Sequence, residues 1–145
     1  MLKTIALTLV GLASLASAYP DADKVASLPQ MDDLSFGLYS GYVDIPNSKK
    51  SLHYMSALSR GNPLTDPLVI WFNGGPGCSS MLGFSQENGP YALNDDDTIF
   101  RSNDYAWNLK ANMFWLESPA GVGFSICGDA TQCKFDDNNS GDDNL

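Results

Sequence analysis

PLVIWFNGGPGCSS, residues 67–80, holds an apolar run and a glycine-rich turn in one continuous segment. The run, residues 67–72, is rich in β-branched and aromatic side chains, which predicts a strand buried on both faces. Gly74, Gly75 and Gly77 then free the backbone to turn sharply and to expose its N–H groups. N–H groups exposed where a central strand ends form an anion-binding nest, as in the oxyanion holes of some hydrolases. An ordinary Gly-Pro turn after a core strand is the alternative.

An antiparallel hairpin is expected ahead of this strand. Residues 36–45 are aromatic and β-branched, residues 46–50 have the composition of a turn, and Leu52, Tyr54, Ser56 and Leu58 give a half-apolar alternation. We expect this hairpin to lie at one edge of the sheet.

A second buried strand is expected at residues 111–117, which lead into another glycine-rich turn at residues 120–123. Before it, residues 79–85 predict a short helix and residues 94–104 a solvated loop. The order strand, loop, short helix, strand is typical of the opening of an open α/β sheet. Two buried strands and a hairpin leave such a sheet incomplete, so the fold class is α/β and the domain is expected to be a part of a larger one.

The composition indicates a chain that folds, and it argues against two kinds of partner. A length of 145 residues suffices for one modest domain, and 43% hydrophobic residues are typical of globular proteins. Eight basic and seventeen acidic residues give a formal net charge of −9, which argues against nucleic acid and against an anionic membrane surface. We also expect no metal and no cofactor, because His53 is the only histidine and no Cys-x-x-Cys spacing occurs.

The first 18 residues have the pattern of a secretory signal peptide. Lys3 is the positive charge near the start, residues 5–15 are apolar and small, and Ala16-Ser17-Ala18 fits the cleavage rule, so we expect cleavage after Ala18. The apolar run is too short to span a bilayer comfortably. Residues 19–145 are therefore expected to be soluble in the lumen of the secretory pathway.

That compartment permits disulfides, and three cysteines are present. Cys127 and Cys133 enclose a small loop and can pair locally, which leaves Cys78 over. Asn138-Asn139-Ser140 is a glycosylation sequon, so Asn138 is expected at the surface if it is occupied.

Four motifs follow one another in a fixed order: WFNGGPGCSS at residues 71–80, ENGP at 87–90, YAWN at 105–108 and ESPAGVGFS at 117–125. In this order the chain resembles the serine carboxypeptidases, a family of α/β-hydrolases, from about Phe36 to its last residue. The resemblance implies that residues 19–145 are the N-terminal portion of such a domain. In that family the cysteine of the glycine-rich loop bonds to one far downstream, which this chain does not contain.

The resemblance also implies a recognition site. The amide of Gly75 would donate to the oxyanion, while Asn73 and the backbone of Gly74 would hold the C-terminal carboxylate of a peptide substrate. Glu87 would join that network, and Trp71 would buttress it. A protonated glutamic acid can donate to a carboxylate that a charged one would repel, so an acidic working pH is expected.

The catalytic residues of a serine hydrolase are not found in this sequence. A nucleophile elbow needs Gly-x-Ser-x-Gly, and the nearest match, at residues 123–127, lacks the second glycine, so we interpret Ser125 as structural. Ser79 and Ser80 follow the glycine-rich loop, but neither stands at the serine position of a Gly-x-Ser-x-Gly pattern. His53 precedes them within the expected hairpin, and we interpret it as a solvent-facing residue and not a base.

We therefore expect an N-terminal fragment that ends before the nucleophile, and the intact protein is expected to be a lysosomal, vacuolar or extracellular carboxypeptidase. The alternatives are an acyltransferase of the same family and a non-catalytic secreted or binding protein. The roles of two further residues stay open. Glu117 ends a buried strand and either caps the following turn or neighbours the site, and Leu82 can line a pocket for the departing residue, which would favour an apolar one.

Overall fold

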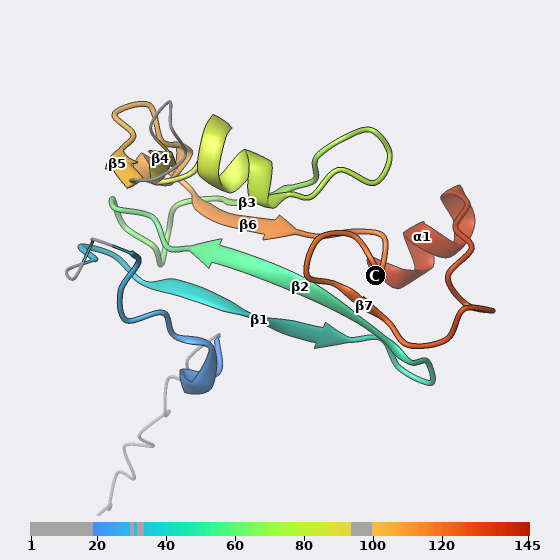
Figure 1. Cartoon of the computed structure of the whole chain (residues 1–145). Coiled ribbons are helices and arrows are strands. Elements are labelled where there is room, and N and C mark those ends of the chain that lie inside the picture. The colour runs from blue at the N-terminus through green and yellow to red at the C-terminus, as the bar shows by residue number, and fades with distance from the viewer. Residues whose placement is uncertain (1–18, 30, 32–33, 94–99) are drawn as a thin grey trace, which may run out of the picture.

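The computed structural model describes residues 19–29, 31, 34–93 and 100–145. A mixed five-stranded sheet organises them, with β1, β2, β6 and β3 side by side in that order and β7 pairing with β2 (Figure 1). Its strands are β1 (Leu38–Asp44), β2 (Lys50–Ala57), β3 (Leu68–Trp71), β6 (Asn112–Leu116) and β7 (Ile126–Cys127). The hairpin and both later strands expected from the sequence are confirmed.

The sheet combines antiparallel and parallel pairing. β1 and β2 form the antiparallel hairpin, β2 also pairs antiparallel with β6, and β3 lies parallel to β6. Because β2 lies between β1 and β6, β1 is the only strand of the hairpin at a sheet edge, so the expectation of an edge hairpin is correct for β1 and wrong for β2. Residues on both faces of β2 are consequently buried, from Leu52 to Ala57.

Six smaller elements complete the description. They are η1 (Asp21–Asp23), η2 (Gly83–Glu87), β4 (Tyr91–Leu93), β5 (Phe100–Ser102), η3 (Trp107–Leu109) and α1 (Asp137–Asp143). η2 is a π-type turn of helix and begins four residues later than the helix expected at residues 79–85. β4 and β5 form a two-stranded sheet, so the loop expected at residues 94–104 is partly strand, and its residues 94–99 lie outside the described residues.

The core lies on the face of the sheet beneath η2. Phe84 from η2 packs edge-on against Trp115 of β6 with ring centroids 5.2 Å apart, and Met113 beside it is fully buried. The opposite face carries a smaller cluster around Leu52 and Leu116. These two clusters hold β6 from both sides and thereby fix the place where β6 ends.

β3 departs from the expectation of burial on both faces. Val69 and Trp71 pack against the core, whereas Leu68 and Ile70 are 59% and 53% exposed. The expectation is wrong for these residues, because the described part of the chain leaves that face of β3 open.

The C-terminal segment contains α1 and returns to the β1–β2 turn. α1 begins with a capping box in which the Asp136 side chain accepts from the backbone N–H groups of Asn138 and Asn139, a short-range signal that the sequence does contain. Asn138 is exposed, as expected of a sequon. The described helices include none long and apolar enough to cross a membrane, and the expected signal peptide lies outside the described residues.

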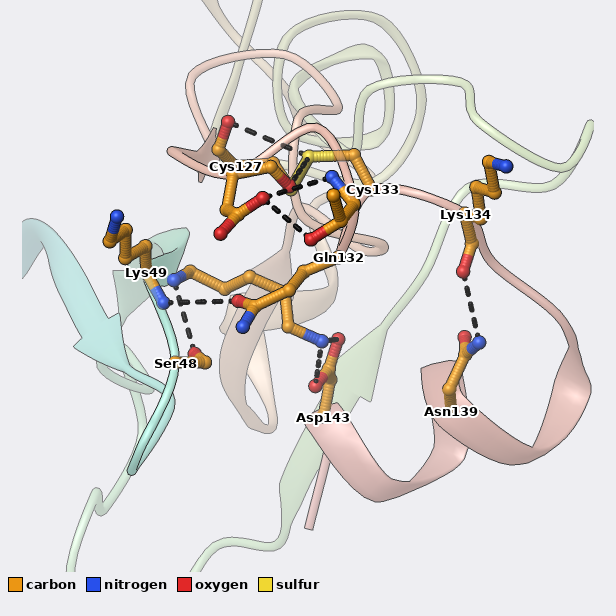
Figure 2. The surroundings of a disulfide bond; sticks show 11 residues. Ser48, Lys49, Cys127, Gln132, Cys133, Lys134, Asn139 and Asp143 are labelled. Carbon is orange, nitrogen blue, oxygen red and sulfur yellow. Dashed lines mark hydrogen bonds and ion pairs between the residues drawn. A yellow bond between two sulfur atoms is a disulfide. The ribbon is translucent and has the colours of Figure 1, made fainter.

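A disulfide and an ion pair fasten this segment. Cys127 and Cys133 are bonded, as expected, and Gln132 in their loop accepts from the backbone N–H of Lys49 (Figure 2). Asp143 of α1 pairs with the Lys50 ammonium at 2.5 Å, and both side chains are nearly buried. The remaining cysteine, Cys78, is free and exposed. The β1–β2 turn is therefore held to the disulfide-bonded loop through Gln132 and to α1 through Asp143.

Removing this disulfide should destabilise the chain. A variant with both Cys127→Ser and Cys133→Ser is expected to lose about 2 kcal/mol of unfolding free energy, because the closed loop is short and its unfolded-state constraint modest. Urea unfolding under non-reducing conditions measures the change. Cys78→Ser is the matched control and is expected to stay within about 0.5 kcal/mol of the parent. Equal losses in both variants would contradict a specific role for this bond.

Candidate recognition site and its support

The glycine-rich loop leaves the end of β3 and stands open to solvent. Gly75 and Gly77 have φ angles of +140° and +96°, in the region where a side chain is strained. In the described part of the chain the N–H groups of Gly74 and Gly75 form no hydrogen bond. A row of unpaired, exposed N–H groups at a strand end has the geometry of an anion nest.

Asn73 is the most firmly oriented side chain of the loop. Its Oδ1 accepts from Trp71 Nε1 at 2.9 Å and from the backbone N–H of Gly83 at 3.1 Å. Its amide nitrogen therefore points the other way and donates to Glu87 Oε1 at 2.7 Å. An amide nitrogen carries two hydrogens, so one remains for a ligand. The structure thus brings together Trp71, Asn73 and Glu87, which the family resemblance had assigned to one network.

Gly83 is required for this arrangement. A Cβ at this position would lie 2.4 Å from Trp71 Nε1 and 2.9 Å from Asn73 Oδ1. The close approach of η2 to β3 is therefore possible only without a side chain there, and it places Glu87, four residues later, against Asn73.

Exposed apolar side chains surround the network. Trp107 packs edge-on against Trp71, with ring centroids 5.4 Å apart, and is 48% exposed. Leu82, the residue before η2, is 41% exposed. These side chains offer apolar contact area beside a polar centre, a combination typical of ligand sites.

Two adjacent serines fasten the end of the loop to the end of β6. Ser80 is buried, accepts from the backbone N–H of Asn73 at 3.1 Å and donates to the carbonyl oxygen of Leu116 at 2.6 Å. Ser79 donates through its hydroxyl to Glu117 Oε1. Neither serine presents a free hydroxyl to solvent as a nucleophile would, in agreement with the sequence interpretation.

Glu117 is fully buried, and three donors meet on its carboxylate. Besides Ser79, it accepts from His53 Nδ1 at 2.9 Å and from the backbone N–H of Phe124 at 2.8 Å. Burial alone would raise the pKa of Glu117, but these hydrogen bonds outweigh burial and hold its pKa below the ordinary value. Of the two roles left open for Glu117, both apply, because it caps the following turn and contacts the loop of the site.

His53 is buried, so the expectation of a solvent-facing residue is wrong. The reason is the position of β2 inside the sheet, where both faces are covered. The His53 ring lies edge-on to Tyr42 and to Phe124, and its Nε2 is 3.0 Å from Ser40 Oγ. Nothing in the local sequence signals this, because the burial arises from the pairing of β2 with a strand some sixty residues later.

Hydrogen bonds join Ser40 to His53 and His53 to Glu117, which is how the serine, the base and the acid of a catalytic triad are linked. Ser40 lies inside β1, however, where the strand pairs with β2, and not on a turn that presents N–H groups to a reacting carbonyl. Ser125 likewise has a structural place, since it donates to the carbonyl oxygen of Glu117 at 2.6 Å and accepts from the backbone N–H of His53. The described residues include no group of three or more side chains arranged to hold a metal.

A parallel pair that ends in a glycine-rich loop, as β3 and β6 do here, is typical of an open α/β sheet. A family profile described as serine carboxypeptidase matches residues 29–145, and the chain belongs to that family. It is 48% identical over 123 residues to serine carboxypeptidase ctsa-3.1 of Caenorhabditis elegans, covering 81% of this chain and 21% of that protein. It is 45% identical over 124 residues to lysosomal protective protein of Mus musculus, covering 85% of this chain and 26% of that protein.

A solved structure agrees with the fold over most of this chain. The prohormone-processing carboxypeptidase Kex1Δp of Saccharomyces cerevisiae superposes with a TM-score of 0.63 at 28% identity, over 81% of this chain and 28% of that one. The two relatives named above are spanned to 21% and 26% of their length.

Neutralising Glu117 should destabilise the fold in a pH-dependent way. Because its pKa is lowered on folding, its charge contributes stability above the ordinary glutamate value of about 4.3, and the contribution is lost as the pH falls through the folded value. Glu117→Gln is expected to cost about 2 kcal/mol or more at pH 7, since donors to a buried charge lose their partner. Urea unfolding measured at several pH values tests this, and a difference that does not shrink toward acid pH would contradict it.

Proposed function

We propose that the glycine-rich loop and Asn73 form the part of a serine-type carboxypeptidase that holds the C-terminal carboxylate of a peptide. The observation that supports this most is the orientation of Asn73, whose oxygen accepts from Trp71 and Gly83 while its nitrogen donates to Glu87 and keeps one hydrogen for a ligand. The unpaired N–H groups of Gly74 and Gly75 stand in the same loop. Together they offer neutral donors to an anion.

Neutral donors suit this ligand in a strongly acidic chain. A net charge of −9 repels anions in general, so an anion must be held by short-range hydrogen bonds and not by long-range attraction. Glu87 lies at the edge of the network with its Oε1 on Asn73. A ligand carboxylate beside the Glu87 carboxylate is repelled by it, and one proton shared between the two carboxyl groups removes that repulsion. The affinity is therefore expected to rise as the pH falls.

The oxyanion donor is assigned to the N–H of Gly75, and cleavage is assigned to residues that these 145 do not include. No Gly-x-Ser-x-Gly is present, so the chain by itself is proposed to bind and not to cut. Hydrolysis of peptides at their C-terminus is proposed for the intact protein, in a lysosome, a vacuole or outside the cell. The disulfide and the name of the mouse relative support a secretory route.

Binding to the chain alone separates these statements. An N-blocked dipeptide with a free carboxylate is expected to bind, and its C-terminal amide is expected not to, as measured by chemical-shift titration. Binding is expected to be tighter at about pH 4.5 than at about pH 7.5. Neither peptide is expected to be cleaved. Release of a free amino acid by the purified chain would overturn the assignment of cleavage to other residues.

Asn73→Ala is expected to weaken binding of the free-acid peptide by about tenfold or more, because a hydrogen bond to a charged group is lost. Asn138→Ala, which removes an exposed asparagine on α1, is the matched control and is expected to leave the affinity unchanged. Equal affinity of the parent for the acid and for the amide would refute carboxylate recognition by this loop.

A further inference from the structure

We propose that Glu117 is a positioning residue for the glycine-rich loop. Acting through the Ser79 hydroxyl, it fixes the end of the loop, while His53 and the backbone N–H of Phe124 hold the carboxylate in place. The proposal rests on the proposed function only for what the loop binds, since the positioning itself is a property of the fold.

The two oxygens of Glu117 serve different segments. Oε1 accepts from the Ser79 hydroxyl, which belongs to the loop, and Oε2 accepts from His53 and from the backbone of Phe124. The Ser79 hydroxyl in turn accepts from the backbone N–H of Met81 at 3.2 Å. One hydroxyl therefore joins the buried carboxylate to the point where the loop turns into η2.

In the part of the chain that the structure describes, the hydrogen bonds that join the loop to the rest of the fold lie at its two ends. At its start the backbone N–H of Asn73 donates to Ser80 Oγ. At its exit Ser80 donates to the carbonyl oxygen of Leu116, and Ser79 donates to the side chain of Glu117, the residue after Leu116. Between them, residues 74–78 are exposed. Because the exposed part has few contacts of its own, its conformation depends on how rigidly these ends are held.

The surroundings leave the carboxylate no other place. Glu117 is fully buried, and a Cβ on Gly123, whose φ is +54°, would lie 1.9 Å from Glu117 Oε1. The second glycine-rich turn thus closes over the carboxylate without a side chain. A buried charge whose donors are removed has no water to replace them, so the loss of one donor is felt at the segment that supplied it.

Variants of two serines that both bond to Glu117 can distinguish positioning of the loop from a general loss of stability. Ser79 bonds the Glu117 side chain and lies in the loop, whereas Ser125 bonds the Glu117 main chain and the backbone of His53. Ser79→Ala therefore cuts the link to the loop, while Ser125→Ala removes a buried hydroxyl from the same cluster and leaves that link intact. Ser79→Thr keeps the hydroxyl and is the rescue variant.

Hydrogen exchange of the full chain measures the effect. The reporters are the amides of Asn73 and Cys78, which bond to Ser80 Oγ and to the Gly74 carbonyl oxygen and not to Ser79. Ser79→Ala is expected to speed their exchange by about tenfold or more, with the β1–β2 amides unchanged. Ser79→Thr is expected to restore the parent rates, and Ser125→Ala to speed exchange in β2 and not in the loop.

Several results would overturn the proposal. These are unchanged loop exchange in Ser79→Ala, an equal increase in Ser125→Ala, or parent loop amides that exchange as fast as an unfolded peptide. Titration with the N-blocked dipeptide is the separate arm. If the parent does not bind it, carboxylate recognition fails while the exchange data still decide on Glu117. If the parent binds it, Ser79→Ala is expected to weaken binding by about threefold to tenfold, and Ser79→Thr to recover it.

Discussion

The buried carboxylate of Glu117 is the contact on which the arrangement of this chain depends. An ionised group without solvent costs several kcal/mol unless donors surround it, and here the donors come from three segments far apart in sequence. A hairpin strand supplies His53, the first glycine-rich loop supplies Ser79, and the second supplies the N–H of Phe124. Each segment is therefore held to the end of β6 by the same charge, and the geometry of one constrains the other two.

The glycines show the same constraint from the side of the backbone. Gly83 lets η2 approach Trp71 and Asn73, and Gly123 lets the second turn close over Glu117. Both positions tolerate no side chain because the space is taken by a polar group of the network, and not because the chain needs to be flexible there. The glycines of the exposed loop differ, since a Cβ on Gly74 or Gly77 would meet nothing within 4 Å. In the loop the absent side chains leave backbone N–H groups accessible, and Gly77 also needs its positive φ.

Local patterns in the sequence were sufficient for the strands and the loop. The hairpin, β3 and β6 follow from composition and turn residues. The network of Trp71, Asn73 and Glu87 was implied by the family resemblance, although its individual hydrogen bonds were not. The burial of His53 was missed because it depends on strand order, which brings β6 beside β2. The openness of β3 was missed for a related reason, since an apolar run predicts a buried strand whether or not anything covers it. α1 was missed although its capping box is visible in the sequence.

The open face of β3 bears on how the recognition loop is supported. The loop continues directly from β3, and in the described residues β3 pairs with β6 along one edge only. Trp71 faces the core and Ile70 faces outward, so the strand that carries the loop is packed on one face and bare on the other. The links through Ser79 and Ser80 to the end of β6 are then the main restraint on the loop from within this chain, because β6 is the strand held from both faces. The position of the glycine-rich loop, and with it the proposed carboxylate site, therefore depends on β6 and Glu117 more than on β3, although β3 and its glycines are the features that stand out in the sequence.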